Sequence, residues 1–286
     1  MTQQWWKQAV VYQIYPKSFM DSDGDGYGDI NGIISKLDYL SDLGVDVLWL
    51  TPIYPSPEKD NGYDISDYYA INPRYGTLEQ FKQLLAQVHQ RDMKLIMDIV
   101  VNHTSTAHEW FKQAMSSVDN PYHDFYIWRD GSPETPPNNW LSKFGGSAWQ
   151  YCAGVGKYYL HLFDVTQADL NWENPRVRQE IYSMMRYWLE LGVDGFRLDV
   201  INLISKQQNF VDDTLLTPTA DGRKFYTDGP RIHEYLHEMN HEVFALRDGL
   251  LTVGEMSSTT LESCVLYTNP ARKELDMVFN FHHLKV

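Results

Sequence analysis

Two acidic residues and an arginine stand near the ends of two short apolar segments. Arg197 and Asp199 lie two positions apart in the segment GFRLDV, and Glu255 interrupts the segment LLTVGEM. Alternate positions of a strand share a face, so Arg197 and Asp199 point the same way. Two carboxyl groups suit glycoside hydrolysis, in which one attacks the anomeric carbon and the other protonates the leaving oxygen. We therefore expect Asp199 to be a nucleophile and Glu255 an acid/base residue.

The neighbours of each carboxyl group set its expected protonation state. A nearby cation lowers a carboxyl pKa, so we expect Arg197 to keep Asp199 ionised. A drier site raises a carboxyl pKa, so we expect Glu255 to hold its proton near neutral pH. The alternative is that each group belongs to a buried ion pair at a strand end. Several polar groups gathered at strand ends favour catalysis over that alternative.

A second candidate site is the segment DSDGDGYGD at residues 21–29. An EF-hand-like loop takes its ligands from alternate positions. Those positions hold Asp21, Asp23, Asp25, the Tyr27 carbonyl and Asp29. The twelfth position is Gly32 rather than glutamate, so a further ligand has to come from water or elsewhere. Carboxylates this close repel each other without a cation, which favours structural Ca²⁺. The alternatives are Mg²⁺ and an ion-free Asp/Gly-rich turn.

Strand-like and helix-like segments alternate around these residues. The strand-like segments are residues 10–16, 45–51, 94–101, 193–200, 250–256 and 277–281, and the helical ones are 30–43, a helix opened by Thr77, 175–191 and 230–246. This alternation predicts a parallel sheet and an α/β fold, the (β/α)8 TIM barrel, of which six strands are recognisable. Such a barrel carries its site at the carboxyl ends of its strands, where Asp98, Asn102 and His103 also lie.

The alternation stops between residues 104 and 172. This stretch is rich in Pro, Asn, Gly, Trp and Tyr and has one short strand-like segment, residues 158–163. An irregular loop of that length is improbable inside a compact domain. We expect an inserted small domain at 104–172, after the third strand, and a discontinuous barrel made of residues 1–103 and 173–286.

Composition excludes several classes of function. The formal net charge of −14 repels polyanions, so we expect no nucleic-acid partner. No apolar run approaches the roughly 18 residues of a membrane span, and the first residues lack the pattern of a signal peptide. Two cysteines form no disulfide framework. These features fit a cytoplasmic enzyme with a small-molecule partner and no membrane partner.

Short motifs connect these residues to a known family. DIVVNH (98–103), GFRLDVIN (195–202) and GEMS (254–257) resemble three of the four signature regions of the α-amylase family, glycoside hydrolase family 13. YQIYPKSF (12–19), DNGYDI (60–65) and ADLNWENP (168–175) resemble its α-glucosidase branch. The resemblance implies a retaining double displacement by Asp199 and Glu255, and a structural calcium remote from the chemistry. It also implies that a terminal glucose is held by Asp60, Tyr63, His103, Phe163 and Arg197. Without it, His103 would be read as a hydrogen-bonded strand-end histidine and Tyr63 as a loop anchor.

Further segments narrow the resemblance. Residues 136–149, 224–240, 252–260 and 279–286 resemble the trehalose-6-phosphate hydrolases, which cut trehalose 6-phosphate into glucose and glucose 6-phosphate. The alternatives are an oligo-1,6-glucosidase acting on a related α-glucoside and a non-catalytic glucosidase-like scaffold. A phosphorylated substrate requires nearby cations. Lys285 is the best candidate, and Arg231, Lys143, His282 and His283 are weaker ones.

Six recognisable strands are two fewer than a closed (β/α)8 barrel needs. The chain has no counterpart of the family's fourth signature region, which bears a third catalytic aspartate, and no C-terminal β-domain. We expect an N-terminal portion of a longer protein that hydrolyses nothing measurable by itself.

Overall fold

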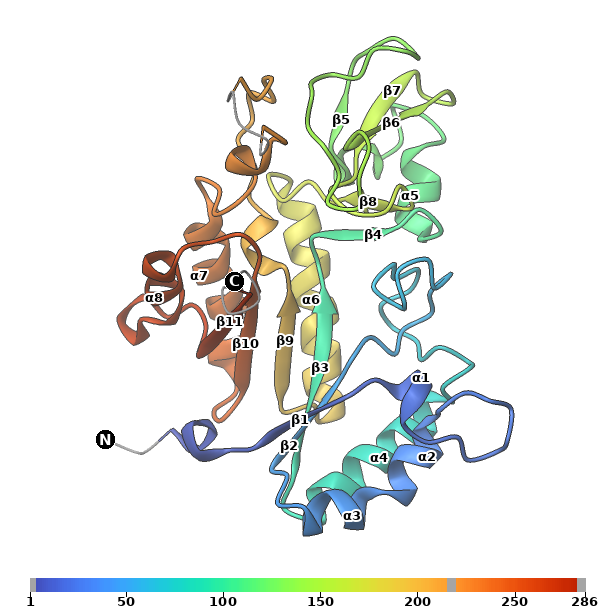
Figure 1. Ribbon diagram of the computed structural model, residues 1–286, viewed down its shortest axis with the longest axis vertical. Coiled ribbons are helices and arrows are strands. Elements are labelled where there is room, and N and C mark those ends of the chain that lie inside the picture. The colour runs from blue at the N-terminus through green and yellow to red at the C-terminus, as the bar shows by residue number, and fades with distance from the viewer. Residues whose placement is uncertain (1–3, 215–219, 282–286) are drawn as a thin grey trace.

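The central sheet has six parallel strands in the spatial order β1-β2-β3-β9-β10-β11. They are β1 (Val11–Ile14), β2 (Val47–Leu50), β3 (Lys94–Val100), β9 (Gly195–Asp199), β10 (Leu251–Met256) and β11 (Met277–Asn280). The computed structural model describes residues 4–214 and 220–281 (Figure 1). Within these residues the strands form an open half-barrel with β1 and β11 at its edges. The predicted TIM-barrel class, with six strands, is confirmed.

Helices connect the strands and cover the sheet. They are α1 (Pro16–Phe19), α2 (Ile30–Ser35), α3 (Leu37–Asp42), α4 (Leu78–His89), α5 (Glu109–Ala114), α6 (Pro175–Leu191), α7 (Ile232–Glu242) and α8 (Leu261–Thr268). Short 3₁₀ turns are η1 (Trp5–Gln8), η2 (His123–Phe125), η3 (Ile201–Leu203), η4 (Arg223–Phe225), η5 (Phe244–Leu246) and η6 (Pro270–Arg272). No helix among the described residues is long and apolar enough to span a bilayer.

Local capping signals fix the ends of the best-defined helices. The Gln80 amide donates to Thr77 Oγ1 at 3.2 Å, and the Thr77 amide donates to Gln80 Oε1 at 2.8 Å, which completes a capping box for α4. Asn174 caps α6, and Gly192 ends it with a φ of +112°. Glycine adopts that left-handed conformation at little cost. The predicted helix opened by Thr77 and the predicted helix at residues 175–191 are therefore confirmed.

The helix predicted over residues 30–43 is in fact two helices, α2 and α3, which meet at Lys36. The Lys36 amide bonds the Ile33 carbonyl at 3.0 Å, so the chain tightens there into a 3₁₀-like turn. The helix predicted over 230–246 ends at Glu242 and continues as η5. Helix α8 was not predicted because its apolar residues do not form one face. Several of them, including Val265, are exposed, so the sequence lacks the usual amphipathic periodicity.

The segment between β3 and β9 builds two small antiparallel sheets. β4 (His103–Ser105) pairs with β8 (Gln167–Asp169), while β5 (Trp128–Arg129), β7 (Lys157–Leu160) and β6 (Trp149–Cys152) form the other sheet. Figure 1 places both beyond the carboxyl end of β3. Only β7 was predicted, because strands of two to four residues leave little periodicity in the sequence. The domain boundaries at 104 and 172 stay a prediction.

Aromatic side chains join segments that lie far apart in the sequence. Trp188 of α6 is fully buried and meets Phe81 of α4 edge-on, with ring centroids 5.5 Å apart. Trp140 stacks on Phe225 at 5.6 Å and so joins the segment between β3 and β9 to the segment after β9. These contacts pack α6 against α4 and join the segment between β3 and β9 to the segment after β9.

Candidate active site

Polar side chains meet at the carboxyl ends of β3, β9 and β10. The register places Asp98 of β3 beside Arg197 of β9, and Arg197 beside Val253 of β10. Gly195 permits this close pairing, because a Cβ there would lie 2.0 Å from the Leu251 carbonyl oxygen. The chain thus brings residues that lie about a hundred positions apart onto neighbouring strands.

One guanidinium contacts three carboxyl groups. Arg197 Nη1 donates to Asp98 Oδ1 at 2.6 Å and to Asp199 Oδ1 at 2.7 Å. Its Nη2 donates to Glu255 Oε2, which also accepts the Val200 amide at 3.3 Å. All four charged side chains are buried. The predicted grouping of Arg197, Asp199 and Glu255 on one face is the arrangement found.

The expected protonation state of Asp199 is wrong. Burial raises the pKa of Asp199 to about 7, although Arg197 acts to lower it. Burial likewise raises the pKa of Asp98 to about 6 against the effect of Arg197. Arg197 does not keep the pKa of Asp199 low, because desolvation outweighs a single cation shared among three carboxyl groups. Glu255 is 7% exposed, as is Asp199, and the expected proton on Glu255 stays a prediction.

Asp98 and an aromatic lining complete this side of the site. Asp98 Oδ2 accepts hydrogen bonds from Trp49 Nε1 at 3.2 Å and from the Tyr63 hydroxyl at 3.1 Å. The Arg197 guanidinium lies 5.2 Å from the Trp49 ring and 5.6 Å from the rings of Tyr63 and Phe279. No sequence pattern gave a role to Trp49 or Phe279. Their positions in apolar strands look like ordinary core.

The remaining predicted sugar-binding residues lie together on another side of the site. We call this side the second, or sugar-binding, wall; it contains Asp60, His103 and Phe163. Gln167 Nε2 lies 2.9 Å from Asp60 Oδ2 and 3.0 Å from His103 Nε2. His103 Nε2 also lies 3.2 Å from the Tyr63 carbonyl, and the His103 and Phe163 ring centroids are 5.2 Å apart. Burial raises the pKa of Asp60 and lowers that of His103. Gln167 joins these residues, yet no motif singled it out.

The candidate phosphate-binding cations fall into two groups. Lys285, His282 and His283 lie outside the described residues. Arg231 pairs with Glu173 and Glu234 and is committed to that surface network. Lys143 Nζ donates to Ser257 Oγ at 3.1 Å, just past the end of β10. Of the cations predicted for phosphate, Lys143 is therefore the one that the described structure brings to the strand ends.

The acidic loop folds around its own backbone amides. Asp21 accepts hydrogen bonds from the amides of Gly24 and Gly26 at 2.7 and 2.9 Å. Asp29 accepts the Ser22 and Gly32 amides and thereby caps α2. Carboxylate oxygens of Asp21, Asp23 and Asp29 lie within 4.8 Å of one another. Oxygen donors at this spacing suit a hard divalent cation. Asp25 is not part of this close group; its carboxylate accepts the Tyr27 amide at 2.8 Å.

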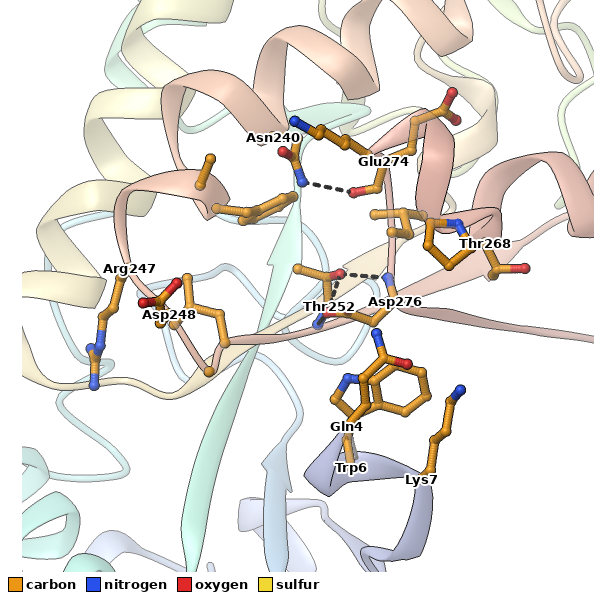
Figure 2. A pocket seen from close by; sticks show the side chains of 17 residues that line it. Gln4, Trp6, Lys7, Asn240, Arg247, Asp248, Thr252, Thr268, Glu274 and Asp276 are labelled. Atoms are coloured by element: carbon orange, nitrogen blue, oxygen red, sulfur yellow. Dashed lines mark hydrogen bonds between the residues drawn. The ribbon is translucent and has the colours of Figure 1, made fainter. Parts of the chain in front are cut away.

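A cavity of about 530 Å³ lies at the opposite end of the sheet, near the start of β10 (Figure 2). Figure 2 shows Thr252 and Asp276 hydrogen-bonded to each other at its wall. Asn240 Nδ2 reaches the Glu274 carbonyl at 3.4 Å. Parallel barrels carry their chemistry at the carboxyl ends, so this cavity is not the active-site candidate.

Known proteins resemble both the sequence and the structure. Residues 13–286 match the model of the alpha-amylase catalytic domain. The trehalose-6-phosphate hydrolase of Bacillus subtilis (strain 168) is 65% identical over 283 residues, which are 99% of this chain and 50% of that protein. The oligo-1,6-glucosidase of Parageobacillus thermoglucosidasius is 56% identical over 286 residues, which are 99% of this chain and 51% of that protein.

A solved structure is similar to this chain in both fold and sequence. The crystal structure of Bacillus licheniformis trehalose-6-phosphate hydrolase matches with a TM-score of 0.94 at 64% identity, covering 99% of this chain and 50% of that one. The chain thus spans about half the length of the curated relatives it matches. Because the family model extends over nearly the whole sequence and the half-barrel carries the expected carboxyl groups, the chain belongs to the α-amylase family.

Proposed function

We propose that this site belongs to a retaining α-glucoside hydrolase in which Asp199 is the nucleophile and Glu255 the acid/base residue. The observation that carries the proposal is that both carboxyl groups meet on Arg197, from adjacent parallel strands. A retaining glycosidase needs two carboxyl groups close together beside the scissile bond. The scaffold alternative would not require this costly burial of charge.

The reaction proceeds in two displacements. The Asp199 carboxylate bonds to the anomeric carbon while Glu255 gives its proton to the leaving oxygen, and the glycosidic C–O bond breaks. Glu255, now ionised, takes a proton from water as the water oxygen bonds to the same carbon and releases Asp199. Because the pKa of Asp199 is about 7, about half of the nucleophile is ionised at neutral pH, and it is fully ionised at alkaline pH.

The second wall binds the terminal glucose. Asp60 and His103 offer hydrogen bonds to sugar hydroxyl groups, and Phe163 offers an apolar face to the ring. Tyr63 and Arg197 border the reacting carbon through their contacts with Asp98 and Asp199. A hydrogen-bonding wall of this kind rejects compounds that lack the matching hydroxyl groups.

Trehalose 6-phosphate is the substrate we propose, with glucose and glucose 6-phosphate as products. Identity of 65% to one trehalose-6-phosphate hydrolase, against 56% to an oligo-1,6-glucosidase, supports this order of preference. A hexose phosphate needs one or two charge-assisted contacts, for which Lys143 and Lys285 are the candidates. A phosphorylated sugar is charged and does not cross a bilayer, which favours a cytoplasmic location. The net charge of −14 speaks against a nucleic-acid partner.

We also propose structural Ca²⁺ in the acidic loop, with Mg²⁺ as the alternative. The clustered oxygens of Asp21, Asp23 and Asp29 fit a hard cation, and Asp25 and the Tyr27 carbonyl lie in the same loop. The cation would hold the start of α2, because Asp29 is also the helix cap. It takes no part in glycoside cleavage.

The test compares two substrates in the protein that carries this chain. We expect faster release of glucose from trehalose 6-phosphate than from isomaltose, and none after Asp199→Ala. Preference for isomaltose would move the assignment to an oligo-1,6-glucosidase. A glucosyl adduct on Asp199, trapped with a fluoroglucoside and found by mass spectrometry, would exclude the scaffold alternative.

A further inference from the structure

A lysine that the proposed reaction does not use is buried beside the site. Lys206 follows η3, in the segment after β9, and is 2% exposed. Its ammonium lies 2.8 Å from Asp169 Oδ1 of β8 and 2.8 Å from Asn102 Oδ1, just after β3. Asp169 and Asn102 are fully buried. We name these three residues the Lys206 triad. It joins the half-barrel to the segment that Figure 1 places beyond β3.

The triad dictates how the Asn102 amide is turned. An ammonium only donates hydrogen bonds, so the Asn102 oxygen has to face Lys206. A carboxylate only accepts them, so the Asn102 nitrogen has to face Asp169, where it lies 2.9 Å from Oδ1. The opposite orientation would set donor against donor and acceptor against acceptor. The amide nitrogen is therefore fixed on the side that also faces His103.

That orientation reaches the imidazole of His103. Asn102 Nδ2 lies 3.3 Å from His103 Nδ1, and an amide nitrogen donates, so Nδ1 has to accept. The imidazole proton then sits on Nε2, where the Tyr63 carbonyl at 3.2 Å accepts it. Gln167 Nε2, at 3.0 Å, favours the other tautomer. Asn102 and Tyr63 together outweigh that single contact.

The same triad also touches the aromatic side of the wall. Asp169 Oδ2 accepts the Leu162 amide at 2.9 Å, and Leu162 directly precedes Phe163. His103 and Asp169 are paired across β4 and β8. One buried ion pair thus holds the backbone before Phe163 and the side chain next to His103.

We propose that Lys206 is a positioning residue that acts through Asn102 to hold His103 as the Nε2–H tautomer, with its proton turned toward the sugar-binding wall. The identity of the sugar rests on the proposed function, whereas the tautomer does not. With the proton on Nε2, the neutral imidazole donates to the Tyr63 carbonyl and is held in place beside the sugar-binding residues, whereas the opposite tautomer presents a lone pair to that carbonyl.

The direct test is ¹⁵N NMR of the histidine-labelled protein that carries this chain. Loss of the His103 signals in His103→Gln identifies them. We expect the unmodified protein to show the Nε2–H form. Lys206→Met leaves Asp169 without its cation, so Asp169 takes up a proton and no longer demands a donor from Asn102. Gln167 then shifts His103 toward the Nδ1–H form.

Two further variants keep the test decisive. The double variant Lys206→Met, Asp169→Asn contains no unpaired buried charge, and it removes both groups that orient Asn102. It should show the same tautomer shift even if Lys206→Met fails to fold. The matched control is Lys94→Met, which breaks a lysine pair with Asp194, 3.8 Å apart, at the amino end of β3. This control should keep the Nε2–H form.

Kinetics completes the comparison. We expect kcat/KM for the α-glucoside to fall on the order of tenfold in both triad variants, the effect of losing roughly one oriented hydrogen bond. The control should stay within about twofold, since partly exposed pairs contribute little. A triad variant with unchanged His103 signals overturns the proposal, whatever its activity. Failure of the unmodified protein to release glucose contradicts the proposed function alone, because the NMR experiment needs no substrate.

Discussion

Asp199 at the end of β9 and Asp21 in the loop before α2 are both aspartates, but their surroundings differ. Burial raises the pKa of Asp199 to about 7. The backbone amides of Gly26 and Gly24 lower the pKa of Asp21, which is partly exposed to solvent. The carboxyl groups around Asp199 are shielded from water and share the Arg197 cation. The carboxyl groups of the acidic loop keep contact with water and accept hydrogen bonds from backbone amides. A buried cluster can exchange a proton near neutral pH, whereas the exposed loop stays anionic and suits a metal cation.

The substitution Arg197→Met should have the largest effect of the changes that test this contrast. The substitution leaves three buried carboxyl groups without a cation, and breaking such a pair costs about 3–5 kcal/mol. We expect a large loss of stability in urea unfolding and no measurable glucose release. Arg91→Met is the control, because its partner Asp38 is exposed and such pairs contribute about 0–1 kcal/mol. Equal losses in the two variants would contradict the contrast.

The pH dependence tests the raised pKa of Asp199. A group whose pKa is about 7 is protonated below that pH and is then a poor nucleophile. We expect kcat/KM to fall below about pH 7, approaching roughly tenfold per unit. Glu255 raises the pKa of Asp199, so Glu255→Gln should move this fall to lower pH. α-Glucosyl fluoride, whose leaving group needs no acid, makes the variant measurable. An unmoved pH profile in Glu255→Gln would contradict the coupling.

Cation binding tests the exposed cluster. At a Ca²⁺ concentration of a hundred times Kd, linkage adds about 2.7 kcal/mol of stability. We expect Ca²⁺ to raise the melting temperature by several degrees and a chelator to reverse the change. The double variant Asp21→Ala, Asp23→Ala should lose the response, and Asp199→Ala should keep it. Loss of the response in Asp199→Ala would instead place the cation at the active site.

The smallest expected effect separates the two tasks of Asp29. Asparagine caps a helix about as well as aspartate, so Asp29→Asn should change stability without cation by less than about 0.5 kcal/mol. It removes one charge from the oxygen cluster, and the Ca²⁺-dependent rise in melting temperature should shrink. Calorimetry with and without Ca²⁺ checks both statements. A large loss in the metal-free protein would mean that Asp29 is needed mainly for the cap.

Much of this protein could be predicted from local sequence. The capping box of Thr77 and Gln80, the Asn174 cap and the Gly192 ending depend on residues within a few positions of each other, so the sequence pattern contains them. The alternation of strands and helices follows from the same short-range periodicity. The spacing of Arg197 and Asp199 within one strand predicted that both point the same way, and the motif GEMS indicated Glu255.

Other features exist only after the chain has folded. Trp49, Gln167 and Lys206 reach the site from distant segments, and in sequence each looks like ordinary core or surface. The break at Lys36 and the short strands between β3 and β9 leave little trace in the periodicity of the sequence. The protonation of Asp199 was mispredicted for the same reason. A neighbouring arginine can be read from two positions away in sequence, but the loss of water around a carboxyl group depends on every segment packed against it.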